Sequence, residues 1–222
     1  MGLFKKKTKQ IDPETLRKAE ESAKEFESAK ELLKTQPLAA LDQIVDAAQK
    51  GAPGAAALAA SLLIENDDLA SSWKTGIRLT NRKTAMSLLD QAVEAGDVMA
   101  MYQQGLYFLE GTFGFDQNKT RFTTLESKAN RKEPGRMAYL LYLHFIQKGD
   151  GKQALDWLKD SAKRSWPQGL ENYVNTLIYG NEKLGLKADL DEARKQAVRL
   201  SKINQISADR YLARINELEQ GK

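Results

Sequence analysis

The chain of 222 residues contains no cysteine and a single histidine, His144. Without thiols it has no disulfide framework, no thiolate nucleophile and no sulfur ligand for a metal. One histidine is too few for a histidine zinc site or a nucleophile–base pair, and His144 stands among apolar residues in AYLLYLHFIQ, which favours a packed core position. We therefore expect no catalytic residue, no metal and no cofactor. The lack of cysteine favours a reducing, cytoplasmic compartment.

Long apolar runs are also missing, since none approaches the roughly 20 residues that cross a bilayer. The longest run, Ala55–Ile64, is rich in alanine and is predicted to be a buried helix. The formal net charge is +4, and the four lysines of the first ten residues account for all of it. Residues 1–11 are read as a flexible basic tail that lacks the apolar region of a secretory signal. The rest of the chain has no net charge, so the sequence gives only a weak indication of nucleic-acid binding, and we do not expect a nucleic acid as a partner.

Helical periodicity is what the sequence does contain. Apolar residues recur at spacings of three and four along nearly the whole chain, and strand patterns are almost absent. Asp12, Pro13 and Glu14 form a helix start signal, which predicts a one-sided N-terminal helix over residues 12–36. Further helices are predicted at about 37–51, 54–65, 82–95, 98–110, 136–148, 152–164, 167–179, 190–202 and 208–219.

Four stretches of helical sequence superimpose on one another. Each has a small residue in its first helix, a turn, and a second small residue early in its second helix. These small residues are, pair by pair, Ala40 and Ala55, Ala85 and Ala100, Ala154 and Gly169, and Ala193 and Ala208. Antiparallel helices need small side chains where their backbones approach, and one pair alone cannot bury its apolar face, so successive pairs are expected to stack.

The repeated pattern resembles the Sel1-like repeat family, a relative of the tetratricopeptide fold. The best copy is AMYQQGLYFLEG, which has the family's residues at Ala100, Gly105, Phe108 and Gly111. The resemblance covers about Pro37 to the carboxyl end. It implies an all-α fold, a right-handed α/α solenoid of Sel1-like, TPR-like helix pairs, with one domain over residues 12–222. It also implies a scaffold or adaptor that binds another protein and has no enzymatic activity.

The middle repeat interval is longer than the others. The alanines that open the four units are 45, 69 and 39 residues apart. The excess predicts an irregular, basic insertion over residues 112–135. Two interpretations stay open: a loop that meets an acidic partner, and a solvated, partly disordered segment. Three phenylalanines in the insertion favour order or contact.

Two surfaces are candidates for partner binding. The helices that line the concave side of such a solenoid offer residues off their packing stripes, together with Gln104, a polar residue in an apolar slot. These candidates are Met101, Gln103, Gln104, Tyr107, Glu171, Asn172, Asn175 and Arg210. The candidates on the insertion are Phe113, Phe115, Arg121, Phe122, Arg131 and Lys132. Trp73 and Trp166 could be packed or could be surface anchors.

The leading hypothesis is a protein-binding scaffold that uses its concave face, the inserted loop, or both. A narrower alternative is a bacterial immunity protein that neutralises a cognate toxin by direct binding. An enzyme of unknown reaction is a more distant alternative. The paired carboxylates at Asp67–Asp68 and Asp189–Glu192 are better explained as helix caps, and no glycine-rich phosphate loop follows a strand. The sequence leaves the partner's identity and the oligomeric state open.

Overall fold

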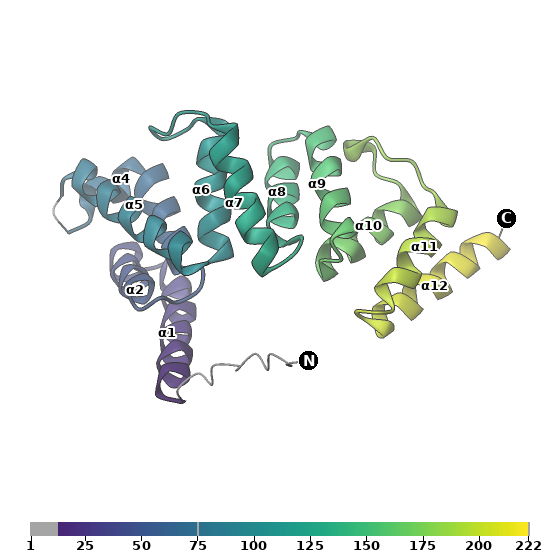
Figure 1. The fold of residues 1–222 in the computed structure, drawn as a ribbon, viewed down its shortest axis with the longest axis horizontal. Coiled ribbons are helices and arrows are strands. Elements are labelled where there is room, and N and C mark those ends of the chain that lie inside the picture. Colours follow the sequence, from purple (N-terminus) through teal and green to yellow (C-terminus); the bar gives the residue numbers. More distant parts are fainter. Residues whose placement is uncertain (1–12, 75, 222) are drawn as a thin grey trace, which may run out of the picture. The chain divides into compact units, whose positions relative to one another are not determined.

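A computed structural model describes residues 13–74 and 76–221. This part of the chain is helical and contains no β-strand, only one isolated bridge between Asn181 and Leu186 (Figure 1). The expected tail over 1–11 and the expected N-cap Asp12 lie outside the described residues. None of the described helices is long and apolar enough to cross a membrane.

The helices are α1 (Pro13–Leu32), α2 (Pro37–Gln49), α3 (Ala55–Ala60), α4 (Asp67–Ser72), α5 (Arg78–Ala95), α6 (Val98–Glu110), α7 (Lys119–Lys132), α8 (Arg136–Gln147), α9 (Gly151–Lys163), α10 (Pro167–Tyr179), α11 (Leu190–Leu200) and α12 (Gln205–Gln220). A π-helical segment, Ser61–Glu65, continues α3, and a 3-10 turn, Glu182–Leu184, lies between α10 and α11. The all-α fold class is confirmed.

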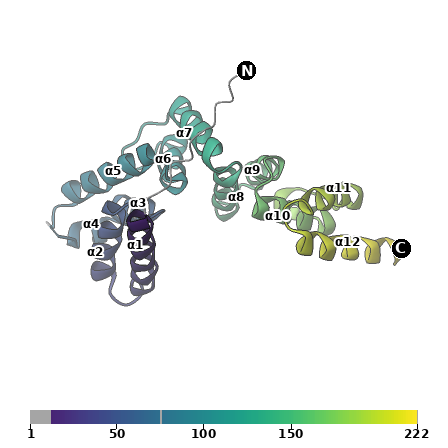
Figure 2. The same cartoon turned by 60° about the horizontal axis from the view of Figure 1, so that its bottom comes forward.

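The chain divides into two compact units, residues 1–103 and 104–222, with the boundary inside α6. The resemblance to Sel1-like repeats predicted a single repeat domain over residues 12–222. In the first unit α1 packs on α2, α2 on α3, and α5 contacts both α3 and α4. In the second unit each helix from α7 to α12 contacts the next one along the chain (Figure 1 and Figure 2).

The small residues of the repeat are core residues, as predicted. Seven of the eight are alanines with 0% exposure: Ala40, Ala55, Ala85, Ala100, Ala154, Ala193 and Ala208. The eighth, Gly169, is buried so closely against α9 that an added Cβ would lie 2.1 Å from Ser161 Oγ. A larger side chain therefore has no room at this contact between α9 and α10.

The segment predicted to be an irregular insertion contains a further helix, α7, which packs on α8. The helices that open the successive pairs begin at Pro37, Arg78, Lys119, Gly151 and Leu190, which places them 41, 41, 32 and 39 residues apart. The long middle interval is thus a fifth helix pair, and the expectation of irregular structure over 112–135 is corrected for residues 119–132. The pattern hid α7 because Phe122 stands where the other units have alanine.

A buried asparagine fastens α4 to α5 in the first unit. Asn81 Nδ2 donates to the carbonyl oxygens of Ala70 at 2.9 Å and Trp73 at 2.5 Å. Trp73 is itself buried, and its Nε1 donates to Asp42 Oδ1 at 2.9 Å. Trp73 is therefore a packed residue and not an exposed surface anchor.

The substitution Asn81→Ala should destabilise the first unit. It leaves two buried carbonyl oxygens without their side-chain donor, so we expect the free energy of unfolding to fall by about 2–4 kcal/mol. Urea unfolding followed by circular dichroism measures the change. Ser87→Ala, on the exposed side of the same helix, is the matched control and should change stability by less than about 0.5 kcal/mol. Equal effects of the two substitutions would contradict this role for Asn81.

Candidate functional site

The exposed side of α7 carries a concentration of positive charge. Asn118 caps the helix, because its side chain accepts a hydrogen bond from the backbone N–H of Arg121 at 2.9 Å. Phe122, Leu125 and Ala129 recur at helical spacing and are buried. The helix exposes five cations, Lys119 and the four that lie along one flank beside Leu125, which we call the α7 cationic face: Arg121, Lys128, Arg131 and Lys132.

No carboxylate shares the α7 cationic face. The acid of this helix, Glu126, lies on its inner side, 3.7 Å from Arg164, where burial and the nearby Asp160 carboxylate raise its pKa. Asp116, in the preceding loop, is exposed. Among the described residues, no ion pair includes any of the four cations of the face or Asp116.

The stability of α7 does not explain this arrangement. Lys128 stands three residues before Arg131 and four before Lys132, and like charges at these spacings each cost about 0.2–0.5 kcal/mol. Lys119 and Arg121 stand in or near the first turn, where cations oppose the helix dipole and where this helix has no acid. Only Arg131 and Lys132, in the last turn, complement the dipole.

Ion pairs lie on the exposed sides of two other helices of the second unit. At the end of α9, Arg164 bonds to Asp160 at 2.7 Å. In α11, Arg194 reaches Glu219 at 2.6 Å and Lys195 reaches Glu192 at 3.4 Å. The α7 cationic face differs in having four cations within twelve residues and no acid on the same face to form such a pair.

A turn with clustered aromatic rings precedes α7. The backbone N–H of Phe115 donates to the carbonyl oxygen of Thr112 at 3.0 Å, which closes a turn over residues 112–115. Phe115 stacks on Tyr107 with ring centroids 5.0 Å apart and meets Phe108 edge-on at 5.3 Å. Phe113 meets Tyr107 edge-on at 5.7 Å and is 45% exposed. Residues 112–115, part of the predicted insertion, therefore form an ordered turn with one aromatic ring at the surface.

Several predicted contact residues are buried and cannot offer a surface. Met101 and Tyr107 are 2% and 1% exposed, and Phe122 is buried against Trp157 with ring centroids 5.9 Å apart. Gln103 is buried and donates to Glu65 Oε1 at 2.7 Å. The expectation that α6 has a free side is corrected, since most residues from 98 to 108 are buried. Gln104 is half-buried.

The candidates on α10 and α12 are divided between structure and surface. Asn172 donates to the Tyr139 hydroxyl at 3.0 Å, and Glu171 accepts from Asn204 at 3.0 Å, so both connect neighbouring helices. Asn175 and Arg210 are exposed.

The remaining candidates belong to the segment after α6: Phe113 and Phe115 lie in the turn before α7, and the exposed Arg121, Arg131 and Lys132 lie on α7. Lys128 belongs to the α7 cationic face and was not among the sequence candidates. Its spacing of seven residues from Arg121 and four from Lys132 is the signal that could have identified it.

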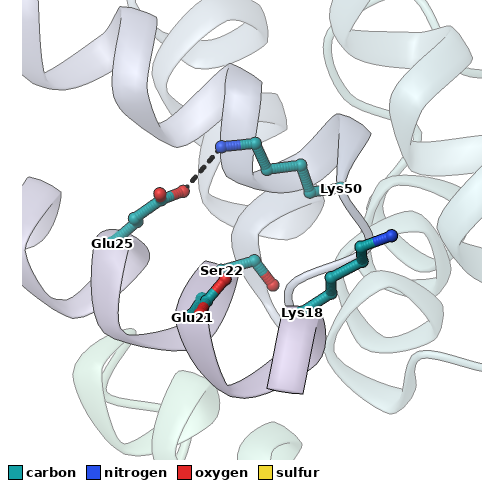
Figure 3. A pocket seen from close by; sticks show the side chains of 5 residues that line it. All are labelled: Lys18, Glu21, Ser22, Glu25 and Lys50. Atoms are coloured by element: carbon teal, nitrogen blue, oxygen red, sulfur yellow. Dashed lines mark hydrogen bonds and ion pairs between the residues drawn. The ribbon is translucent and has the colours of Figure 1, made fainter. Parts of the chain in front are cut away.

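Cavities elsewhere are lined by groups that already have roles. A cavity of about 400 Å³ beside α1 is lined by Lys18, Glu21, Ser22, Glu25 and Lys50 (Figure 3). Lys50 forms ion pairs with Asp46 and with Glu25, each at 2.7 Å, and these bonds raise the pKa of Lys50 above its usual value. The charged residues that line this cavity are all in ion pairs with other residues of the chain, so the cavity is not a candidate ligand site.

A second cavity, of about 560 Å³, lies beside the start of α11 and the end of α12. Its Asp189 caps α11 by accepting from the backbone N–H of Glu192 at 2.9 Å, as the sequence predicted. Asp67, of the other acidic pair, bonds to Arg78 and Arg82. No three His, Asp or Glu side chains of the described residues lie together as metal ligands would.

His144 belongs to a charged network at the end of α6. Its Nε2 lies 2.7 Å from Glu110 Oε1, and Lys148 Nζ lies 2.5 Å from the same oxygen. Burial alone would raise the pKa of Glu110, but the hydrogen bonds from Lys148 and His144 hold it below its usual range. The network connects α6 to α8 within the second unit.

No protein-family model matches the chain, and no curated protein or solved structure matches it. The resemblance to Sel1-like repeats therefore stays a prediction. It depends on the repeated small residues and on the helix pairs, and the function depends on the surfaces described above.

The substitution Glu110→Gln should reduce stability near neutral pH and much less in acid. The folded-state pKa of Glu110 is lowered, so its contribution is present above the usual carboxyl pKa and is lost as the pH falls through the lowered value. Chemical unfolding at about pH 7 and about pH 3 measures the difference between variant and wild type. Asp156→Asn, on the exposed side of α9, is the control. A difference that does not shrink in acid would contradict the assignment.

Proposed function

We propose that this chain is a protein-binding module built from Sel1-like helix pairs, and that it holds an acidic segment of a partner protein on the α7 cationic face. The observation that carries the proposal is the set of four exposed cations without a carboxylate among them. The four cations repel one another in the free protein, and a negatively charged partner segment would relieve this repulsion. Charge complementarity would also speed the encounter with the partner and favour its correct orientation.

The way α7 is held supports this role. Phe122, Leu125 and Ala129 anchor its inner side, and the contact with α8 fixes its direction. An added Cβ on Gly105 of α6 would lie 2.8 Å from Met137 Cε and 3.5 Å from Phe122 Cδ2, so these helices lie close together. A rigid helix presents its charges without an ordering cost when the partner binds. Stacked helix pairs, in the solenoid that we propose, would supply such a rigid support.

An acidic protein segment fits better than a nucleic acid. The α7 cationic face lies on one helix, and two cations that follow it in the chain are neutralised: Arg136 bonds to Glu133 at 2.7 Å, and Arg164 bonds to Asp160. Nucleic acids are usually bound by basic surfaces that extend over more of a domain. The net charge beyond the first ten residues is zero.

The substitution Lys128→Glu should separate binding from stability. A carboxylate at position 128 replaces two repulsions with attractions to Arg131 and Lys132, so the thermal midpoint should stay the same or rise slightly. Binding of the partner should fall at least tenfold. We would capture partners from a nuclease-treated lysate of the native host with the tagged full chain, quantify them by mass spectrometry, and measure the thermal midpoints of both proteins.

Lys159→Glu, on the exposed side of α9, changes the net charge by the same amount and is the matched control. The proposal predicts proteins with acidic segments that wild type and Lys159→Glu retain and that Lys128→Glu loses. Equal capture by all three proteins would refute it. Capture that disappears on nuclease treatment would favour a nucleic acid instead.

A further inference from the structure

The turn before α7 holds a phenylalanine in an unfavourable backbone conformation. Phe113 has φ +57° and Gly114 has φ +87°. Non-glycine residues with positive φ are uncommon, and for an L residue this region costs roughly 1–2 kcal/mol. Glycine or asparagine would fit position 113 with less strain, so the ring itself needs an explanation.

The loop around Phe113 is fastened at both ends. Gly111 N–H donates to Tyr107 O at 2.9 Å, and Asn118 N–H donates to Phe108 O at 2.7 Å. The side chain of Gln117 donates to Leu109 O at 2.9 Å. These hydrogen bonds hold the loop against the end of α6, so the turn that carries Phe113 is already ordered before any partner binds.

Most of the exposed aromatic surface in this cluster belongs to Phe113. Tyr107 and Phe108 are buried, Phe115 is half-buried, and Phe113 is 45% exposed. The edge contact with Tyr107 supports one side of the Phe113 ring and leaves the rest open to solvent. The strained backbone at Phe113 exposes an apolar ring, which contributes little to the stability of the folded chain. Exposed aromatic rings are typical anchors of protein interfaces.

The aromatic cluster adjoins the α7 cationic face. The Arg121 guanidinium lies 5.1 Å from the centre of the Phe108 ring, and Phe108 contacts Phe115. From Arg121 to Lys132 the face is eleven residues long, or roughly 16 Å at the helical rise. An extended acidic stretch of about five residues matches that length. Phe113 lies beyond the Arg121 end of the face.

Resting on the proposed function, we infer that Phe113 is an apolar anchor for the partner, and that the partner segment carries an apolar side chain next to its carboxylates. The cations attract and orient the acidic stretch, and the Phe113 ring selects among acidic segments for those with an adjoining apolar residue. Charge alone discriminates poorly between acidic sequences, whereas a buried aromatic contact contributes specificity.

Selection from a displayed library of random twelve-residue peptides tests the inference. The baits are the full-length wild type, Phe113→Asn and Lys128→Glu, each checked for native circular dichroism. Asparagine tolerates positive φ, so Phe113→Asn keeps the turn and removes the ring. Phe113→Tyr keeps an aromatic ring and is the matched control for binding measurements.

Wild type should select peptides rich in Asp and Glu with a neighbouring apolar residue. Phe113→Asn should keep the acidic preference and lose the apolar one. The best wild-type peptide, made synthetically, should bind Phe113→Asn at least tenfold more weakly and Phe113→Tyr within about threefold of wild type, since most of the aromatic contact is retained.

Two failures are distinguishable. An apolar preference that persists in Phe113→Asn, or is missing from wild type, overturns the anchor and leaves acidic docking standing. No acidic preference in wild type, or one that survives Lys128→Glu unchanged, overturns the proposed function itself.

Discussion

The close approach of neighbouring helix backbones is the constraint on which the rest of the structure depends. At Gly169 an added Cβ would lie 2.1 Å from Ser161 Oγ, and at Gly151 it would lie 1.6 Å from the carbonyl oxygen of Lys183. The buried alanines of the other pairs show the same requirement for small side chains. Because interiors are densely packed, each helix contact allows little choice of rotation. The face that a helix turns to solvent is therefore determined by the small and apolar residues on its other side.

This constraint gives the α7 cationic face its direction. Phe122, Leu125 and Ala129 fill the inner side of α7, so the charges at Arg121 and Lys128 must lie outside. Several cations on other helices are paired with acids, whereas the four cations of the α7 cationic face have no acid within ion-pair distance among the described residues. The helix accepts local repulsion that a single acidic substitution would remove. A surface that is less stable than it could easily be is a frequent property of binding sites.

The sequence predicted the helix pairs well because the determinants are local. Small residues at fixed spacing and glycine at turns report on backbone approach, and Gly96 does end α5 in the left-handed conformation. The pair formed by α7 and α8 was not predicted, because Phe122 breaks the pattern of small residues. Only the apolar stripe through Leu125 and Ala129 indicates the helix α7. A pattern based on alanine cannot identify a unit whose core position holds a large ring.

The candidate site was harder to predict, because exposure depends on contacts between distant segments. Met101 and Tyr107 lie off the apolar stripe of α6 and were expected at the surface, but neighbouring elements cover them. Lys128 was missed because residues 119–132 were expected to be irregular, so its helical spacing from Arg121 and Lys132 was not considered. Phe113 was a candidate by composition, and only the backbone shows that its ring is held at the tip of a turn.

NMR mapping of an acidic peptide on the chain would locate the surface that binds it. The chain, at 24.8 kDa, is small enough for backbone amide assignment. A twelve-residue peptide of alternating Asp and Glu would be titrated into the isotope-labelled protein at low salt. If the peptide binds the α7 cationic face, chemical-shift changes should be confined to residues 112–132 and should disappear when the salt concentration is raised. Changes spread over the exposed faces of α9 and α12, or no changes at all, would contradict binding at this face.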